Sequence, residues 1–170
     1  MNLYLVRHAV AHGRDAERWP DDSRRPLTPE GEEKFRVAAR GLEEVVSRVE
    51  RVLSSPFDRA WRTAEVLSEQ SRWSYPEELP ELEPDLPPHK ILAALGDPGA
   101  DSIALVGHRP SLNELASYLL CGSSEGLDVK IKKGGVLCVR LDGSPAPGAG
   151  KLQWLLSPKV LRALGQSTDR

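Results

Sequence analysis

The chain alternates short apolar runs with longer segments in which apolar residues recur at helical spacing. The apolar runs have the length and composition of strands buried in a sheet. We predict strands at residues 3–6, 51–54, 102–106, 136–141 and 151–156. Helical segments separate the first three, which favours parallel pairing, whereas a short turn joins the last two, which we expect to form an antiparallel edge.

Capping residues and prolines mark where the helices begin. Thr28 and Pro29 predict a helix whose apolar positions recur from Phe35 to Val46. Further helices are predicted over residues 55–68, 90–95 and 111–120 and from residue 158, with irregular segments over 11–27 and 72–88. This order predicts a three-layer α/β fold, with helices on both faces of a mostly parallel sheet and one domain over residues 1–170.

Composition and charge restrict the classes of function. The net charge is −2, so no overall basic field draws the chain to nucleic acid or to an anionic membrane. No apolar run is long enough to span a bilayer, and the first one ends at Arg7 too soon for a signal peptide, so we expect a cytoplasmic location. Cys121 and Cys138 are isolated and are interpreted as reduced core thiols. With no cluster of ligand residues, we expect no metal or organic cofactor.

Arginine and histidine side chains follow three of the predicted strands. Arg7 and His8 follow the first strand, Arg59 lies in the first turn after the second, and His108 follows the third. The carboxyl ends of parallel strands form one crevice, so these four side chains are expected to converge. Guanidinium groups match phosphate oxygens, a neutral imidazole is a nucleophile, and a protonated imidazole is a further donor. The set therefore predicts phosphoryl transfer.

The stretches around these residues carry a family resemblance. They include Val6-Arg7-His8-Ala9, a following Arg-Pro-Leu-Thr stretch, and a Ser-Ser-Pro stretch leading to Arg59-Ala60. Together with Val106-Gly107-His108 and the segment 154–159, they occur in the order and spacing of the family. The chain resembles the histidine phosphatase superfamily, and within it the small SixA-type phosphohistidine phosphatases. The resemblance implies a phosphoglycerate mutase-like fold, a nucleophilic His8, and phosphoryl binding by Arg7, Arg59 and His108.

Four residues near these motifs raise separate questions. Ala9 stands where the family has glycine, which would be strained if the backbone there required a special angle. Arg25 belongs to a matched stretch and is a candidate for the pocket rim. Arg62 replaces a common glutamine, and is interpreted either as a further rim cation or as a solvated side chain. Many members of the family use a glutamate from a loop in this region as the general acid, so the resemblance implies this role for Glu81, although a solvated acidic loop is an equal alternative.

Three other polar features are interpreted as surface chemistry. His12 and His89 lie in polar settings without evident partners, so we expect both at the surface. The charged run 130–133 is interpreted as a solvated strand edge, with a docking patch for an acidic partner as the alternative.

These residues suggest a mechanism. Neutral His8 attacks phosphorus, Arg7, Arg59 and a protonated His108 stabilise the transferring group, Glu81 protonates the leaving atom, and water hydrolyses phospho-His8. We expect the substrate to be phosphohistidine on a protein. The alternatives are a phosphatase or mutase acting on a small phosphate ester and, from another class, a non-catalytic module that binds phosphorylated ligands.

Overall fold

The fold is built on one six-stranded sheet. The computed structural model describes residues 1–96 and 99–167. Within them the strands lie in the order β3-β2-β4-β1-β5-β6. Their bounds are β1 (Asn2–Arg7), β2 (Arg51–Ser54), β3 (Pro76–Glu78), β4 (Ser102–Gly107), β5 (Val136–Leu141) and β6 (Gly150–Leu156). The first four pair in parallel, and β5 and β6 form the expected antiparallel edge.

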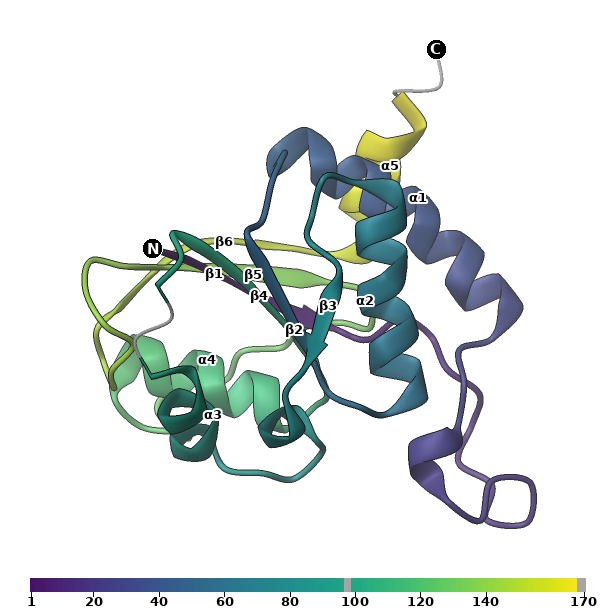
Figure 1. Ribbon diagram of the computed structural model, residues 1–170, viewed down its shortest axis with the longest axis horizontal. Helices are drawn as coiled ribbons and strands as arrows, with labels where there is room; N and C mark the ends of the chain where they lie inside the picture. Colours follow the sequence, from purple (N-terminus) through teal and green to yellow (C-terminus); the bar gives the residue numbers. More distant parts are fainter. Residues whose placement is uncertain (97–98, 168–170) are drawn as a thin grey trace.

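Helices cover both faces of this sheet, which confirms the predicted three-layer α/β fold (Figure 1). They are α1 (Pro29–Val45), α2 (Asp58–Gln70), α3 (Pro88–Leu95), α4 (Ser111–Cys121) and α5 (Pro158–Ser167). Alternate residues of β1 divide between two cores: Tyr4 and Val6 pack toward α1, α2 and α5, whereas Leu3 and Leu5 pack toward α3 and α4. Each buried strand is therefore apolar on both faces, as its sequence indicated.

Local sequence explains where α1 begins and how closely it packs. The hydroxyl of Thr28 accepts a hydrogen bond from the Gly31 amide at 2.9 Å, so Thr28 caps the helix as predicted. Farther along, a side chain at Gly41 would bring its Cβ within 1.9 Å of the Leu161 carbonyl oxygen. Glycine is thus required at this position, because the backbones of α1 and α5 meet there.

Several sequence-based expectations differ from the structure. The segment predicted to be irregular over 72–88 contains β3 and a short 3₁₀ turn, η2 (Pro80–Leu82). The second long helix begins at Asp58, later than the Ser55-Pro56 pair suggested, because Phe57 occupies the capping position without a side-chain cap. Cys138 is a buried thiol, but Cys121 is exposed at the end of α4. The basic run 130–133 is a loop before β5 and not a strand edge. Among the described residues, no helix is long and apolar enough to cross a membrane.

Candidate active site

The four side chains expected to converge line one pocket at the carboxyl ends of β1, β2 and β4. The pocket has a volume of about 240 Å³, and its walls include Arg7, His8, Arg59 and His108. The parallel register places Arg7 opposite Gly107, and the His8 amide donates to the Gly107 carbonyl at 3.0 Å. The first and third strand ends are thereby joined directly, which brings together residues a hundred positions apart in sequence.

His8 is held in an orientation that leaves one ring nitrogen free. Its Nδ1 lies 2.7 Å from the Ala9 carbonyl oxygen, so Nδ1 carries the proton and Nε2 keeps its lone pair. The Ala9 amide in turn donates to Thr63 Oγ1 at 3.0 Å, and that hydroxyl donates to the Arg59 carbonyl at 2.7 Å. Thr63 therefore links the backbone beside His8 to the helix that carries Arg59.

Alanine at the position of the family's glycine causes no backbone strain. Among the described residues, the only non-glycine residue with a positive φ is Asp85. Ala9 therefore has a backbone conformation that any residue can adopt. Its methyl group is buried within the core on the α1 side of the sheet.

The surroundings of both pocket histidines favour the neutral ring near pH 7. Burial, reinforced by Arg59 and Arg7, lowers the pKa of His8 to about 3. Burial and the neighbouring His8 lower the pKa of His108 to about 2. The two rings lie 5.2 Å apart, centroid to centroid. The protein's own groups therefore disfavour the protonated His108 expected during transfer, because a further buried positive charge beside several guanidinium groups is unfavourable.

A neutral His108 still has one ring N–H that can donate a hydrogen bond. Its Nε2 lies 2.9 Å from Ser55 Oγ, and this nitrogen can accept the hydroxyl proton. The other nitrogen, Nδ1, is buried and has no hydrogen-bond partner in the described part of the chain. If Nδ1 carries the ring proton, this N–H is a donor that no described residue satisfies.

Asp22 orients two of the pocket's arginines. One carboxylate oxygen accepts from Arg25 Nε at 2.8 Å, and the other accepts from Arg59 Nη2 at 3.0 Å. The Asp22 carbonyl also accepts from Arg59 Nη1 at 2.8 Å. Hydrogen bonding from Arg25 is the main cause that lowers the pKa of Asp22. Sequence reasoning missed Asp22, although its position three residues before Arg25 is a spacing at which ion pairs form.

The pocket walls are strongly basic. They carry Arg25, as expected for the rim, and also Arg14, Arg109 and Lys133. None of the described residues that line the pocket is an aspartate or glutamate. Burial lowers the pKa of Lys133, and the nearby Arg7 lowers it further. Such an excess of positive charge is suited to an anion with more than one negative charge.

Other polar residues are not where the sequence indicated. His12 lines the pocket, with its ring 5.8 Å from that of Trp19, and is not a surface histidine without partners. His89 is exposed as expected. Glu81 lies in η2 and does not line the pocket, because the chain turns so that Pro84 faces it instead. The structure therefore does not bring the predicted general acid to the phosphoryl site.

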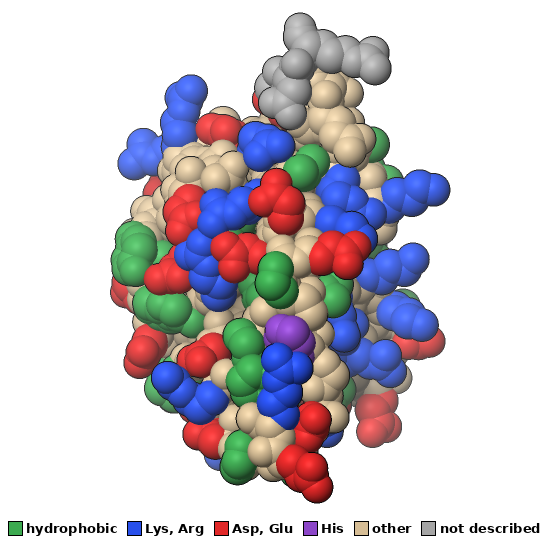
Figure 2. All heavy atoms as spheres, turned by 90° about the vertical axis from the view of Figure 1, so that its right-hand side faces the viewer, with side chains coloured by type: hydrophobic (Ala, Val, Ile, Leu, Met, Phe, Trp, Pro, Cys, Tyr) green, Lys and Arg blue, Asp and Glu red, His purple; other side chains and the backbone are tan. Residues whose placement is uncertain are grey.

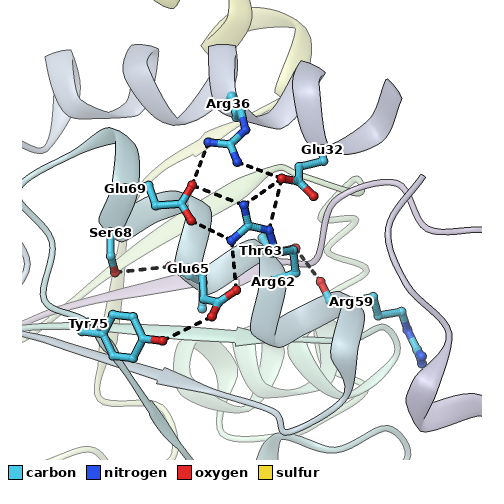
Figure 3. A network of polar contacts seen from close by, with 10 residues as sticks. Glu32, Arg36, Arg59, Arg62, Thr63, Glu65, Ser68, Glu69 and Tyr75 are labelled. Atoms are coloured by element: carbon cyan, nitrogen blue, oxygen red, sulfur yellow. Dashed lines mark hydrogen bonds and ion pairs between the residues drawn. The ribbon is translucent and has the colours of Figure 1, made fainter. Parts of the chain in front are cut away.

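Arg62 is not a rim residue. Its guanidinium donates to Glu32 on α1 at 2.8 Å, and to Glu65 and Glu69 on its own helix at 3.0 Å and 2.7 Å (Figure 3). Hydrogen bonds to these carboxylates raise its pKa. Arg36 joins the same network through Glu32 and Glu69. Arg62 therefore holds α2 against α1. The side of the molecule on which these two helices lie in Figure 1 has basic and acidic side chains interspersed (Figure 2).

Comparison with known proteins finds the same family that the sequence motifs resemble. Residues 3–84 match the model of the histidine phosphatase superfamily, branch 1. The phosphohistidine phosphatase SixA of Escherichia coli K12 is 33% identical over 166 residues, covering 95% of this chain and 97% of that protein. A solved structure of the protein histidine phosphatase SixA complexed with tungstate superposes with a TM-score of 0.80 at 32% identity, covering 95% of this chain and 99% of the other.

A more distant relative shares the fold. The alpha-ribazole phosphatase of Shigella flexneri superposes with a TM-score of 0.71 at 18% identity, covering 93% of this chain and 97% of that one. With its phosphoglycerate mutase-like sheet and its SixA-like sequence over nearly the whole chain, this protein belongs to the histidine phosphatase superfamily. It is a phosphatase of the type that works through a histidine.

Proposed function

We propose that His8 is the nucleophile and that the reaction proceeds through phospho-His8. The observation that carries this proposal is the hydrogen bond from His8 Nδ1 to the Ala9 carbonyl, which leaves Nε2 free inside a basic pocket. Nε2 donates its electron pair to phosphorus, and the bond to the leaving group breaks with its electron pair going to that group. Water then attacks phosphorus, and the phosphate leaves His8.

The surrounding groups stabilise the phosphoryl group as it moves. Arg7, Arg59 and His108 line the pocket, and hydrogen bonds to the Ile131 and Asp22 carbonyl oxygens hold the two guanidinium groups in place. Preorganised donors of this kind act where negative charge develops, and they need no metal ion to do so. Arg7, Arg59 and His108 are therefore the phosphoryl-binding residues of the proposal, with Arg25 at the rim.

We further propose that the substrate is phosphohistidine on a protein. The 33% identity to a phosphohistidine phosphatase supports this choice. So does the lack of a carboxylate among the described residues that line the pocket. A phosphohistidine ring that is protonated on its other nitrogen departs as neutral imidazole, so no acid side chain has to reach the breaking bond. A cytoplasmic location and a single domain over residues 1–170 belong to the same proposal.

The competing candidate is a small phosphate ester. The Shigella flexneri relative is named an alpha-ribazole phosphatase, and fold alone does not decide the substrate. The test is kcat/KM for a phosphohistidine-bearing protein domain against a panel of sugar phosphates and other phosphorylated metabolites. We expect the phosphoprotein to be preferred. A metabolite preferred by tenfold or more, about 1.4 kcal/mol in transition-state stabilisation, would overturn the choice of substrate.

A further inference from the structure

A second hollow adjoins the phosphoryl pocket and has the opposite chemistry. This groove has a volume of about 450 Å³, and it shares Arg14 and Pro84 with the pocket. Its walls include the rings of Trp19 and Phe57 and the carboxylates of Asp15 and Asp85. The phosphoryl pocket is basic and the groove beside it is aromatic and acidic, so the combined site is bipolar.

Phe57 forms the junction between the two spaces. Its ring lies edge-on to His108, with centroids 5.2 Å apart, and the Arg59 guanidinium carbon stands 5.0 Å over it. The same ring is part of the groove wall. Phe57 therefore connects the Arg59 and His108 side of the phosphoryl pocket with the groove. Flat aromatic walls favour a ring in that position.

Asp15 and Asp85 give the groove a free negative charge. Asp22 also lines it, but its carboxylate is taken by Arg25 and Arg59. Asp15 accepts only backbone amides, at residues 17 and 18, and neither Asp15 nor Asp85 forms a salt bridge within the described part of the chain. The groove also carries positive charge, since Arg14 lines it and the Arg18 guanidinium carbon stands 4.9 Å over the Trp19 ring. Two carboxylates without an ion pair beside aromatic rings still attract a cationic ring or a ring with a cationic neighbour.

We propose that this groove is the leaving-group subsite, and that it selects a ring carrying positive charge. The inference rests on the proposed function and deepens it, since the occupant would be the protonated imidazole ring of phosphohistidine on the substrate protein. That form of the ring departs as neutral imidazole when its bond to phosphorus breaks. The groove thus favours the reactive form of the substrate, which suits a pocket whose described walls provide no acid.

Two matched aryl phosphates test the groove without relying on phosphohistidine. They are 4-(aminomethyl)phenyl phosphate and 4-carboxyphenyl phosphate, whose phenols are similar in acidity and whose substituents have opposite charge. We expect kcat/KM for the ammonium ester to exceed that for the carboxylate ester by about tenfold, the effect of two partly solvated carboxylates. In the double variant Asp15→Asn, Asp85→Asn the ratio should fall to within about twofold of unity.

Asparagine is the substitution that disturbs these two sites least. At residue 15 it keeps the oxygen that accepts the two backbone amides, and at residue 85 it tolerates the φ of 64° that Asp85 adopts. Asp142→Asn is the matched control, since Asp142 is an exposed aspartate after β5, beside the amino end of β1 and so at the opposite end of the strands from the pocket. It should retain the wild-type ratio.

The outcomes separate this inference from the proposed function. Equal rates for the two esters in the wild type, a preference for the carboxylate ester, or an unchanged ratio in the double variant would overturn the subsite. If the ester preference is present but phosphohistidine proteins are not hydrolysed, the groove stands as a subsite for cationic rings and the proposed substrate is wrong.

The variant Trp19→Leu tests the aromatic wall of the groove. For each aryl ester, kcat/KM relative to that for acetyl phosphate, which has no ring, should fall about fivefold. An unchanged ratio would remove the aromatic wall from the subsite.

Discussion

Arg59 and Arg62 lie three residues apart on α2, yet their environments are opposite. Arg59 is 2% exposed, donates to one residue, Asp22, and keeps a buried Nε with no partner in the described part of the chain. Arg62 is surrounded by three carboxylates and donates to all of them. Burial lowers the pKa of Arg59, whereas hydrogen bonds to carboxylates raise that of Arg62.

The contrast shows how one helix serves two purposes. A guanidinium that is saturated with carboxylates has no donor left for a substrate, so the Arg62 network can only hold α1 and α2 together. A guanidinium that is buried and partly unpaired is costly without an anion and is satisfied when one binds. The phosphoryl pocket holds three of the buried side-chain nitrogens that lack a partner in the described part of the chain, and its variants should change activity more than stability.

The largest effect is expected at His8. Changing His8→Ala removes the proposed nucleophile, so turnover of any phosphate ester should fall on the order of 10³-fold or more. Because His8 is neutral, its loss leaves no unpaired charge, and the thermal unfolding midpoint should not fall. Steady-state kinetics and a thermal melt on the same preparation provide the measurements. Substantial activity in a folded His8→Ala protein would remove His8 from the mechanism.

The paired variants Arg59→Lys and Arg62→Lys test the comparison directly. Lysine keeps the charge but loses the planar fork, so kcat/KM should fall about 10²-fold or more at residue 59. At residue 62 the same change should alter kcat/KM by less than about threefold.

The stability of Arg62→Ala tests the other half of the comparison, the role of the Arg62 network in holding α1 and α2 together. Removing this guanidinium leaves Glu32, Glu65 and Glu69 facing one another, and the free energy of unfolding should fall by about 1 kcal/mol, less at high salt. Chemical denaturation at two salt concentrations measures it. A larger loss of activity at residue 62 than at residue 59 would reverse the assigned roles.

The buried histidines predict how stability depends on pH. The folded-state pKa values of His8 and His108 are about 3 and about 2, below the usual 6.5. Below pH 6.5 the unfolded chain therefore binds protons at these two residues that the folded chain does not bind. Stability should therefore be lost as pH falls through 6.5, by about 2 kcal/mol per histidine between pH 7 and pH 5. Denaturant titrations should show a smaller loss for His8→Ala than for the wild type. Equal losses in the two proteins would contradict the low pKa of His8.

A smaller effect is expected at Asp22. In Asp22→Asn, Arg25 and Arg59 lose the charge that holds them side by side, so their donors should be less well aligned for phosphate. We expect kcat/KM to fall about fivefold, mainly through KM, since positioning of the bound group is affected. Asp22→Glu should recover part of the loss. Inhibition by inorganic phosphate gives an independent readout, and tighter phosphate binding in Asp22→Asn would show that Asp22 competes with the anion and does not position its ligands.

Much of the sheet and of the phosphoryl pocket follows from the sequence because the relevant rules are local. Apolar runs such as 102–106 have few alternatives to a buried strand, and parallel strands must bring Arg7 and His108 to one edge. Strand β3 was missed because Pro76 and its acidic neighbours have low strand propensity, and pairing with β2 overrides it.

The rest of the site depends on long-range packing. Whether Arg62 reaches the pocket depends on a carboxylate that α1 places nearby, Glu32, and this partner is too distant in the sequence for a spacing rule to give it. The path of the chain after η2 determines that Pro84, and not Glu81, faces the pocket. The pKa of His108 likewise follows from burial beside His8, which its own sequence neighbours do not reveal.

The most direct measurement is to trap the phosphorylated enzyme. The protein is mixed with a phosphate ester, quenched in alkali after a few milliseconds and digested for mass spectrometry. We predict one phosphoryl group on the peptide that contains His8, stable in base, lost in acid, and absent from His8→Ala. A phosphoryl group on another residue, or rapid turnover with no trapped intermediate and full activity in His8→Ala, would contradict transfer to His8.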